Sequence, residues 1–179
     1  EMNTSAENNR TLIKWDLSSI PSGATVTSAI LSIYVNGDYS DNARTMSAYR
    51  VLRNWVEGNG GAGSGATWNV YDGTNNWGTA GAANTTTDRE ATNIGTASIA
   101  NNLAAATEVQ IVLTASKVQE WISGALTNYG VLLQVDTETN DAYLYDSHEG
   151  ATAGVRPKIV IEYTTGIAGY KALLGVGQA

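Results

Sequence analysis

Short runs in which apolar and polar residues alternate recur along most of the chain, and each predicts a β-strand with one buried face. The clearest run places Ala29, Leu31, Ile33 and Val35 on one side. Other runs with strand character cover residues 10–17, 45–53, 108–113, 130–135, 142–146 and 158–163. Turn-forming residues separate neighbouring runs. Many short strands between turns predict an all-β protein with an antiparallel β-sandwich or jelly-roll fold.

The same alternation predicts which side chains point into the sandwich. Ile13, Trp15 and Leu17 share one face of the first run. Tyr49 and Val51 are expected to point inward from the third. Because the chain contains no Phe, aliphatic side chains together with Trp and Tyr must build the core.

One segment departs from this alternation and predicts a single short α-helix. Val118, Trp121 and Ile122 are spaced at i, i+3 and i+4, which puts them on one helical face. Thr114 can cap the beginning of the helix, and Gly124 supplies a residue that ends it.

Residues 58–93, here called the excursion, are rich in Gly, Ala and Asn and show no strand pattern. A stretch of that length without secondary structure is unusual inside a compact domain. The excursion contains Trp68, Tyr71 and Trp77. We therefore expect it to be ordered and held in place by its aromatic side chains.

The amino-acid composition limits the kinds of molecule that the protein is expected to bind. The net charge is −7, and phosphate binding depends on clustered Lys and Arg, so nucleic acid is not an expected partner. An anionic membrane surface is disfavoured for the same reason. No apolar run approaches the roughly 20 residues that a membrane span requires. Neither nucleic acid nor a membrane is therefore expected.

Two N-glycosylation patterns begin at Asn3 and Asn84, which are the candidate glycosylation sites. The chain opens with Glu1 and Met2, which indicates that an upstream segment is removed or not represented. The glycosylation patterns favour an exported protein, so we expect an extracellular or cell-surface location.

Side chains that could carry out catalysis are sparse. The chain has no Cys, which excludes disulfides and cysteine nucleophiles. His148 is the only histidine and lies in an Asp-Ser-His-Glu segment typical of surface loops. We therefore predict no catalytic residue and do not expect an enzyme.

Calcium is the one cofactor that the sequence suggests. Asp136, Glu138 and Asp141 cluster in a turn, and carboxylates with backbone carbonyls are ligands that Ca²⁺ prefers. Four more acidic residues flank or lie in the excursion: Glu57, Asp72, Asp88 and Glu90. The spacing is not that of an EF-hand, and acidic turns are also common as purely solvated features.

Aromatic residues in and just before the excursion could form a platform that stacks on sugars. The candidates for glycan contact are Trp55, Trp68, Tyr71 and Trp77. Asp72, Asn75 and Asn76 could then hydrogen-bond sugar hydroxyls. The alternative is that the rings only anchor the excursion to the sandwich.

Several motifs, in order, resemble the DNRLRE-type β-sandwich domain, which is related to disaggregatase-associated repeats and to a carbohydrate-binding-module family. They are RTLIKWDLSSIP at residues 10–21, ATVTSAIL at 24–31, VLRNWVEG at 51–58, ATWN at 66–69, VQEWI at 118–122, NYG at 128–130, DSHE at 146–149 and RP at 156–157. The resemblance implies a jelly-roll-like sandwich of exported, cell-surface and virion-associated proteins, sometimes appended to polysaccharide-degrading enzymes. It implies no catalytic residues.

One departure from that family concerns the two ends of the chain. Members usually have further strands before the segment at residues 10–21, ending in a Leu-x-Val-Gly-like stretch. A similar stretch, YKALLGVG, stands here at residues 170–177. We therefore divide the chain into a sandwich domain at residues 1–165 and a C-terminal extension strand at residues 166–179, here called the tail.

The tail predicts a mode of self-assembly. Its candidate groove-facing residues share one parity: Ala168, Tyr170, Ala172, Leu174 and Val176. If each tail completes the sheet of the next copy, the contact is head-to-tail and builds a filament. Alternatively, the tail folds back on its own domain, or the chain is one unit of a tandem array.

Two functional hypotheses follow. The first is a structural subunit of an extracellular or cell-surface filament that polymerises through the tail, with a second copy of itself as the partner. The alternative is a non-catalytic carbohydrate-binding module of a secreted or surface protein, with polysaccharide as the partner.

Overall fold

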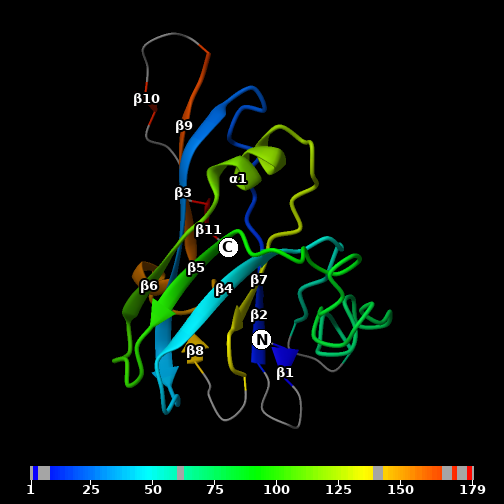
Figure 1. The fold of residues 1–179 in the computed structure, drawn as a ribbon, viewed down its shortest axis with the longest axis vertical. Coiled ribbons are helices and arrows are strands. Elements are labelled where there is room, and N and C mark those ends of the chain that lie inside the picture. The colour runs from blue at the N-terminus through cyan, green and yellow to red at the C-terminus, as the bar shows by residue number, and fades with distance from the viewer. Residues whose placement is uncertain are drawn as a thin grey trace.

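The computed structural model describes residues 2–3, 9–59, 63–138, 143–166, 171–172 and 177–178. Two antiparallel β-sheets pack face to face, which confirms the predicted all-β sandwich (Figure 1). The first sheet has the order β1 (Met2–Asn3), β2 (Asn9–Ile13), β7 (Val131–Val135), β4 (Arg44–Arg50) and β5 (Gly95–Ile99). Strands from distant parts of the chain are thus neighbours.

The second sheet is built around the long strand β3 (Thr25–Asp38). On one side β3 pairs with β6 (Thr107–Val112), and on the other with β9 (Lys158–Thr164) and β8 (Tyr143–Tyr145). The outer edge of β9 pairs with β10 (Lys171–Ala172) and β11 (Gly177–Gln178). A short 3₁₀-helix at Ala153–Val155 precedes β9.

The main core lies between the two sheets. Ala29, Leu31, Ile33 and Val35 are completely buried, as their alternation predicts. The same core contains Met46, Ala48, Ile99 and Leu133 from the first sheet, and Ile111, Ile159 and Ile161 from the strands beside β3. Trp15 also belongs to this core although its residue follows the end of β2, whereas Leu17 is only partly buried.

The helix α1 (Ala115–Ile122) packs against β3 and buries Val118, Trp121 and Ile122, which confirms the predicted face. Gln119 fastens it, because its side-chain amide donates to the carbonyl of Ala24 and accepts from the N–H of Val26. The predicted side-chain cap is wrong: Thr114 occupies the N-cap position without a side-chain cap hydrogen bond. No described helix is long and apolar enough to cross a membrane.

The predicted inward direction of Tyr49 and Val51 is also wrong. Met46 and Ala48 are the residues of β4 that enter the main core. Tyr49 and Val51 instead join a second apolar cluster with Trp77. The outer face of this sheet is therefore buried as well, because the excursion covers it.

The excursion is ordered by hydrogen bonds and by its aromatic side chains, as predicted. In Figure 1 it forms the green coils beside the first sheet. The second cluster has Val51, Trp77, Ala82 and Leu132 at its centre, with Leu12, Tyr49, Trp55, Ala66, Trp68, Tyr71 and Tyr129 around them. A third layer thus covers β2, β4 and β7.

The described part of the tail pairs with β9 of the same chain. Lys171 and Ala172 lie opposite Thr164 and Tyr163, and Gly177 lies opposite Ile159. This arrangement is the one expected if the tail folds back on its own domain. The other candidate donor residues, Ala168, Tyr170, Leu174 and Val176, lie outside the described residues.

Candidate functional site

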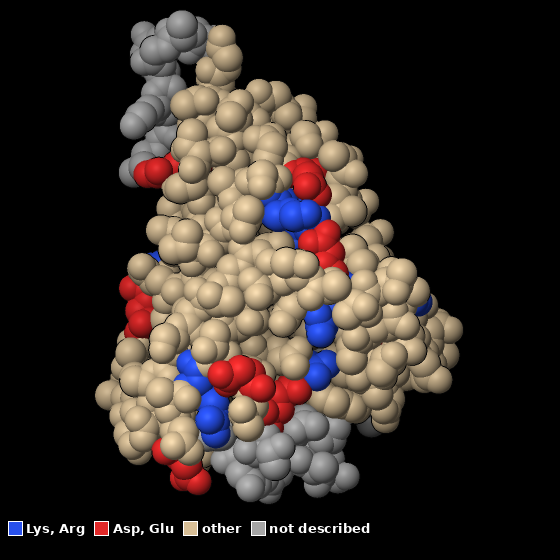
Figure 2. Space-filling model, viewed as in Figure 1, with Lys and Arg blue, Asp and Glu red and all other residues tan. Residues whose placement is uncertain are grey.

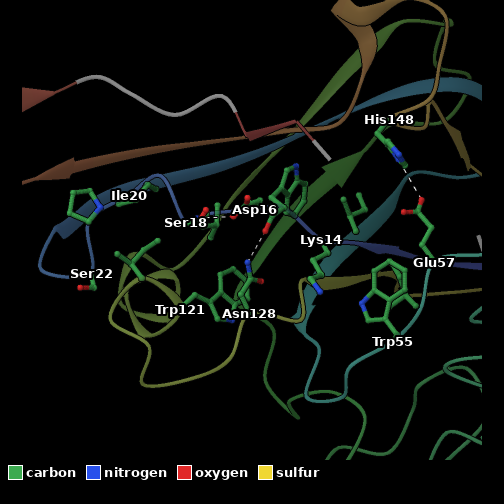
Figure 3. Close-up of a pocket in the computed structure, with 16 residues that line it drawn as sticks. Lys14, Asp16, Ser18, Ile20, Ser22, Trp55, Glu57, Trp121, Asn128 and His148 are labelled. Carbon is green, nitrogen blue, oxygen red and sulfur yellow. Dashed lines mark hydrogen bonds and ion pairs between the residues drawn. The ribbon is translucent and has the colours of Figure 1, made fainter.

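A groove of about 840 Å³ opens where the chain leaves β2 (Figure 3). One wall consists of the residues that continue from β2 into the following turn. Other walls come from the segment just before the excursion, from α1 and from two loops. Its lining comprises residues 12–18 and 20–22 together with Trp55, Glu57, Trp121, Ile122, Asn128 and His148.

Along the wall that follows β2, buried and exposed side chains still alternate as in a strand. This alternation determines which side chains line the groove. Trp15 is buried, whereas its neighbours Lys14 and Asp16 are exposed. The side-chain amide of Asn128 donates to the carbonyl of Trp15 at 2.9 Å and its oxygen accepts from the N–H of Gly130 at 2.9 Å. Asn128 therefore fixes this wall through backbone contacts on both sides.

Gly130 is required for this packing. Its φ is +80°, a left-handed conformation that L side chains rarely adopt. A Cβ atom at this position would lie 2.0 Å from the carbonyl oxygen of Ile13. Only glycine lets the beginning of β7 approach the end of β2 so closely.

Trp55 supplies an aromatic wall. Its indole Nε1 donates to the carbonyl oxygen of Tyr129 at 2.8 Å, and the residue is half-buried. The polar edge of the ring is thus already hydrogen-bonded within the protein. What the ring presents to the groove is its apolar surface, which suits the C–H faces of a sugar.

Four titratable side chains line the groove. Asp16 accepts a 2.9 Å hydrogen bond from the N–H of Ser18, and this backbone contact, followed by the Ser18 hydroxyl, lowers the pKa of Asp16. The Nδ1 atom of His148 lies 3.5 Å from Oε1 of Glu57, and Figure 3 shows these two side chains facing each other. Lys14 is the fourth.

A second, smaller pocket of about 290 Å³ shares several lining residues with the groove. The shared residues are Leu12, Ile13, Glu57 and His148. The smaller pocket continues between β2 and β8, where Tyr143, Leu144 and Tyr145 line it.

The four aromatic residues proposed for glycan contact gather in the second cluster, but only Trp55 also lines the groove. Trp77 is 4% exposed, and its Nε1 donates to the carbonyl of Thr67. Tyr71 packs edge-on against Trp77. These contacts are those expected of rings that anchor the excursion.

Two of these rings are also covered by arginines. The guanidinium of Arg53 lies 4.7 Å from the ring centre of Tyr71, and that of Arg10 lies 5.0 Å from the ring centre of Trp68. Asp72 accepts from the N–H groups of Thr74 and Asn75 and so closes a local turn. A glycan contact by Trp68 or Tyr71 stays a prediction.

The acidic residues proposed for Ca²⁺ have other partners. Glu138 forms a two-pronged ion pair with Arg10, and Asp136 is exposed. Asp141 lies outside the described residues. Among the residues that the structure describes, no group of three or more His, Cys, Asp or Glu side chains is placed to hold a metal. A calcium site stays a prediction.

Acidic residues near the excursion serve mainly as hydrogen-bond acceptors. Asp88 is completely buried and accepts from the N–H groups of Gly78, Thr79 and Asn84. Glu90 pairs with the buried guanidinium of Arg50. Figure 2 shows acidic and basic side chains interspersed on the visible face.

Of the two candidate glycosylation sites, Asn84 can be placed. Its side-chain oxygen accepts from the N–H groups of Thr86 and Thr87, so the residue closes a turn of the excursion. The side chain of Asn3 lies outside the described part of the chain. Glycosylation at either position stays a prediction.

Sequence reasoning missed most of the groove, including Lys14, Asp16 and Trp121. The lining comes from segments far apart in the chain, so no local motif marks it. The available signal was the pair of charged residues, Lys14 and Asp16, on either side of the buried Trp15.

Comparison with known proteins gives one match. Residues 1–69 match the model of carbohydrate-binding module family 96, so this part of the chain is similar to a carbohydrate-binding module. The search among curated proteins and the search among solved structures each gave no match. Of the groove-lining residues, all but Trp121, Ile122, Asn128 and His148 lie within the matched segment.

Proposed function

We propose that this protein is a non-catalytic carbohydrate-binding module that holds a polysaccharide in the groove beside β2. The main support for the proposal is that the segment of the chain that matches the family also lines the groove. This matching segment supplies most of the lining of this groove. A location outside the cell, where structural polysaccharides are found, belongs to the same proposal.

The chemistry of the lining supports this use. Sugar sites combine an apolar or aromatic surface with a few fixed polar groups. Here Trp55 provides the aromatic surface, and exposed Lys14, Asp16 and Ser18 provide the polar groups. The N–H of Ser18 and the carbonyl of Tyr129 hold Asp16 and Trp55 in place. A preorganised lining lowers the entropy cost of binding.

A glycan array followed by pull-down on insoluble polysaccharides tests the proposal. We expect the intact chain to bind at least one glycan, and Trp55→Ala to weaken that binding about tenfold or more, as loss of an aromatic anchor does. Lys14→Ala should also weaken it. Tyr39→Ala, at a 69% exposed residue outside the groove, is the matched control.

The same assay shows whether the glycan binds in the groove or on the aromatic residues of the excursion. Trp68→Ala removes a ring that lies under Arg10 rather than in the groove. If Trp68→Ala abolished binding in folded protein while Trp55→Ala left it intact, the excursion would be the glycan platform. Retention by no polysaccharide would end the proposal. Far-ultraviolet circular dichroism of each variant confirms that it is folded.

A second candidate function is the filament subunit. The outer edge of β9 accepts the backbone of Lys171, Ala172, Gly177 and Gln178. The same register supplied by a neighbouring copy would join two molecules head to tail. Light scattering after size-exclusion chromatography compares the chain with a variant lacking residues 166–179. Assemblies that persist without the tail, or a chain that is only monomeric, would exclude this candidate.

A further inference from the structure

We propose that the open edge of β2 accepts the tail of a second copy of this chain as an additional β-strand. The inference goes beyond glycan binding, because its partner is a polypeptide and its test needs no sugar. It also differs from the head-to-tail contact considered above, in which the acceptor is β9. It rests on the pairing of β2, the position of the two cavities and the sequence of the tail.

One edge of β2 is only partly paired. On the side away from β7, the described structure pairs β2 with β1 at Asn9 and Arg10 alone (Figure 1). Residues 11–13 therefore have no strand on that side within the described part of the chain. The chain continues as residues 14–17, which belong to no described strand although their exposed and buried side chains still alternate. An edge of this kind is available for pairing with another chain.

Both cavities lie along this same edge. The groove is lined by residues 12–18 and the smaller pocket by residues 11–13. Neighbouring residues of an extended chain point to opposite faces, so a cavity that touches all of them follows the edge rather than one face. Figure 3 shows Lys14, Asp16 and Ser18 in succession beside the groove. The space therefore runs along the chain, in the position that an added strand would take.

The lining can receive apolar side chains from an added strand. The apolar residues along the groove are Leu12, Ile13, Trp15, Leu17, Ile20, Trp121 and Ile122. The smaller pocket adds the three residues of β8, a strand that in the described structure pairs with β3 alone. An incoming strand could thus bury every second side chain while its backbone pairs with β2, as in other cases of β-strand addition.

The tail has the length and the pattern that this edge requires. Four apolar residues share one side of its extended form, namely Tyr170, Ala172, Leu174 and Val176. They span seven residues, as do residues 11–17 of the acceptor, and seven extended residues measure about 23 Å. Within the described structure only four tail residues pair with β9 of their own chain. The exchange would replace these four pairs by up to seven.

Charge favours the same occupant. Lys171 is the only charged side chain of the tail. The groove lining carries two carboxylates, Asp16 and Glu57, against one ammonium group, Lys14. With His148 neutral the lining is therefore net negative, and an incoming strand with a single cation is electrostatically complementary to it.

Hydrogen exchange with a synthetic peptide of residues 166–179 tests the acceptor on the intact chain. With saturating peptide we expect the amides of residues 11–17 to exchange about tenfold more slowly or less, because new backbone pairs protect them. A peptide with Leu174→Asp, which places a charge on the apolar side, is the matched control and should give no protection. Protection confined to residues 158–164 would assign the peptide to β9 and overturn the proposal, as would no protection at all.

Cross-linking shows whether the strand comes from a second copy. The chain has no Cys, so single engineered cysteines mark single positions. Copies with Lys14→Cys are mixed with copies with Leu173→Cys and treated with a short bismaleimide, and mass spectrometry identifies the product that joins the two variants. We expect more of it than when the first copy carries Thr164→Cys, opposite Lys171 in β9, or the exposed Asp136→Cys.

A charge exchange tests the contribution of Lys171. Lys171→Glu in the donor copy should lower the yield of the joined product about two- to fivefold, the range expected for an exposed ion pair. Asp16→Lys combined with Glu57→Lys in the acceptor copy should restore that yield. Far-ultraviolet circular dichroism confirms that each variant is folded.

The remaining outcomes are equally decisive. Equal yields from Lys14→Cys and Asp136→Cys would show only random collisions and overturn the proposal. A product formed mainly with Thr164→Cys would do the same, because β9 would then be the acceptor. Neither experiment contains a glycan, so a failure to bind polysaccharide would end the proposed function and leave this inference standing.

Discussion

The guanidinium of Arg10 and the carboxylate of Glu138 meet in two parallel hydrogen bonds, Nε to Oε1 and Nη2 to Oε2, each 2.8 Å long. The two side chains are 9% and 13% exposed. Arg10 also donates to the carbonyl of Gly81 and lies over the ring of Trp68. One side chain thereby joins β2, the loop after β7 and the excursion.

Removal of Glu138 should therefore destabilise the fold. Glu138→Ala leaves the largely buried charge of Arg10 without its counterion, which costs about 3–5 kcal/mol. A double-mutant cycle with Arg10→Ala should give a coupling energy of about 1–3 kcal/mol, because each single change already removes the pair. Urea denaturation measures both quantities.

The exposed residue Asp136 serves as the control for this cycle. Asp136→Ala should change the unfolding free energy by no more than about 0.5 kcal/mol. A coupling energy near zero between Arg10 and Glu138 would contradict the role assigned to the pair.

The buried carboxylate of Asp88 should hold one half of the excursion together. It accepts hydrogen bonds from Gly78, Thr79 and Asn84, and Nε of Arg53 lies 3.4 Å away. Asp88→Ala leaves these part-buried N–H groups without their acceptor, at a cost of about 1–3 kcal/mol. Hydrogen exchange should accelerate in residues 78–88 while the amides of β3 and β9 remain protected. Uniform acceleration across the molecule would contradict a local role.

Gly130→Ala should be among the most damaging single substitutions at the groove. The added methyl group would meet the carbonyl of Ile13 in a backbone conformation that already disfavours alanine. We expect a loss of more than about 2 kcal/mol, measured by thermal unfolding. Gly23→Ala is the control, since a Cβ there has no atom within 4 Å. Equal stability of the two variants would show that the close approach is not required.

Glu108 should make a pH-dependent contribution to stability. It lies across from Tyr34, whose hydroxyl donates to it at 3.2 Å, and Nζ of Lys158 is 3.6 Å away. The Ser32 hydroxyl, as the largest cause, together with the contacts from Gln110, Tyr34 and Lys158, lowers the pKa of Glu108 against the opposing effect of burial. The folded state therefore favours the ionised form.

The sign of the effect follows from linkage. A carboxyl whose pKa is lower in the folded state adds stability above its unfolded pKa, about 4.3 for Glu, and this stability is lost as the pH falls through the folded value. Glu108→Gln should therefore be less stable than the unaltered chain at pH 7 and equally stable near pH 2. Denaturant curves across this range measure the difference, and a gap that did not depend on pH would contradict the assignment.

Much of the fold could be predicted because strand alternation and helical spacing are local signals. Leu31, Ile33 and Val35 enter the core as their period of two requires. The predicted direction of Tyr49 was wrong because alternation separates the two faces of a strand but does not show which face points into the main core. Here both faces of β4 are covered, one by the opposite sheet and the other by the excursion.

The groove could not be predicted for a different reason. Lys14 and Asp16 belong to it because Asn128 and Gly130, more than a hundred residues later, bring β7 against the end of β2. Trp121 belongs to the helix α1, which packs on β3. Aromatic residues near one another in sequence, such as Trp68 and Trp77, were the visible signal, and they serve mainly to secure the excursion.

The pairing of the strands sets a limit on how this domain could be exchanged between proteins. The family match ends at residue 69, yet β2 pairs with β7, and β3 with β6 and β9, all of which come later in the chain. A gene fragment cut at that point would encode strands without their neighbours. Recombination that transfers a folded domain must therefore carry the coding sequence at least through Thr164, the last residue of β9.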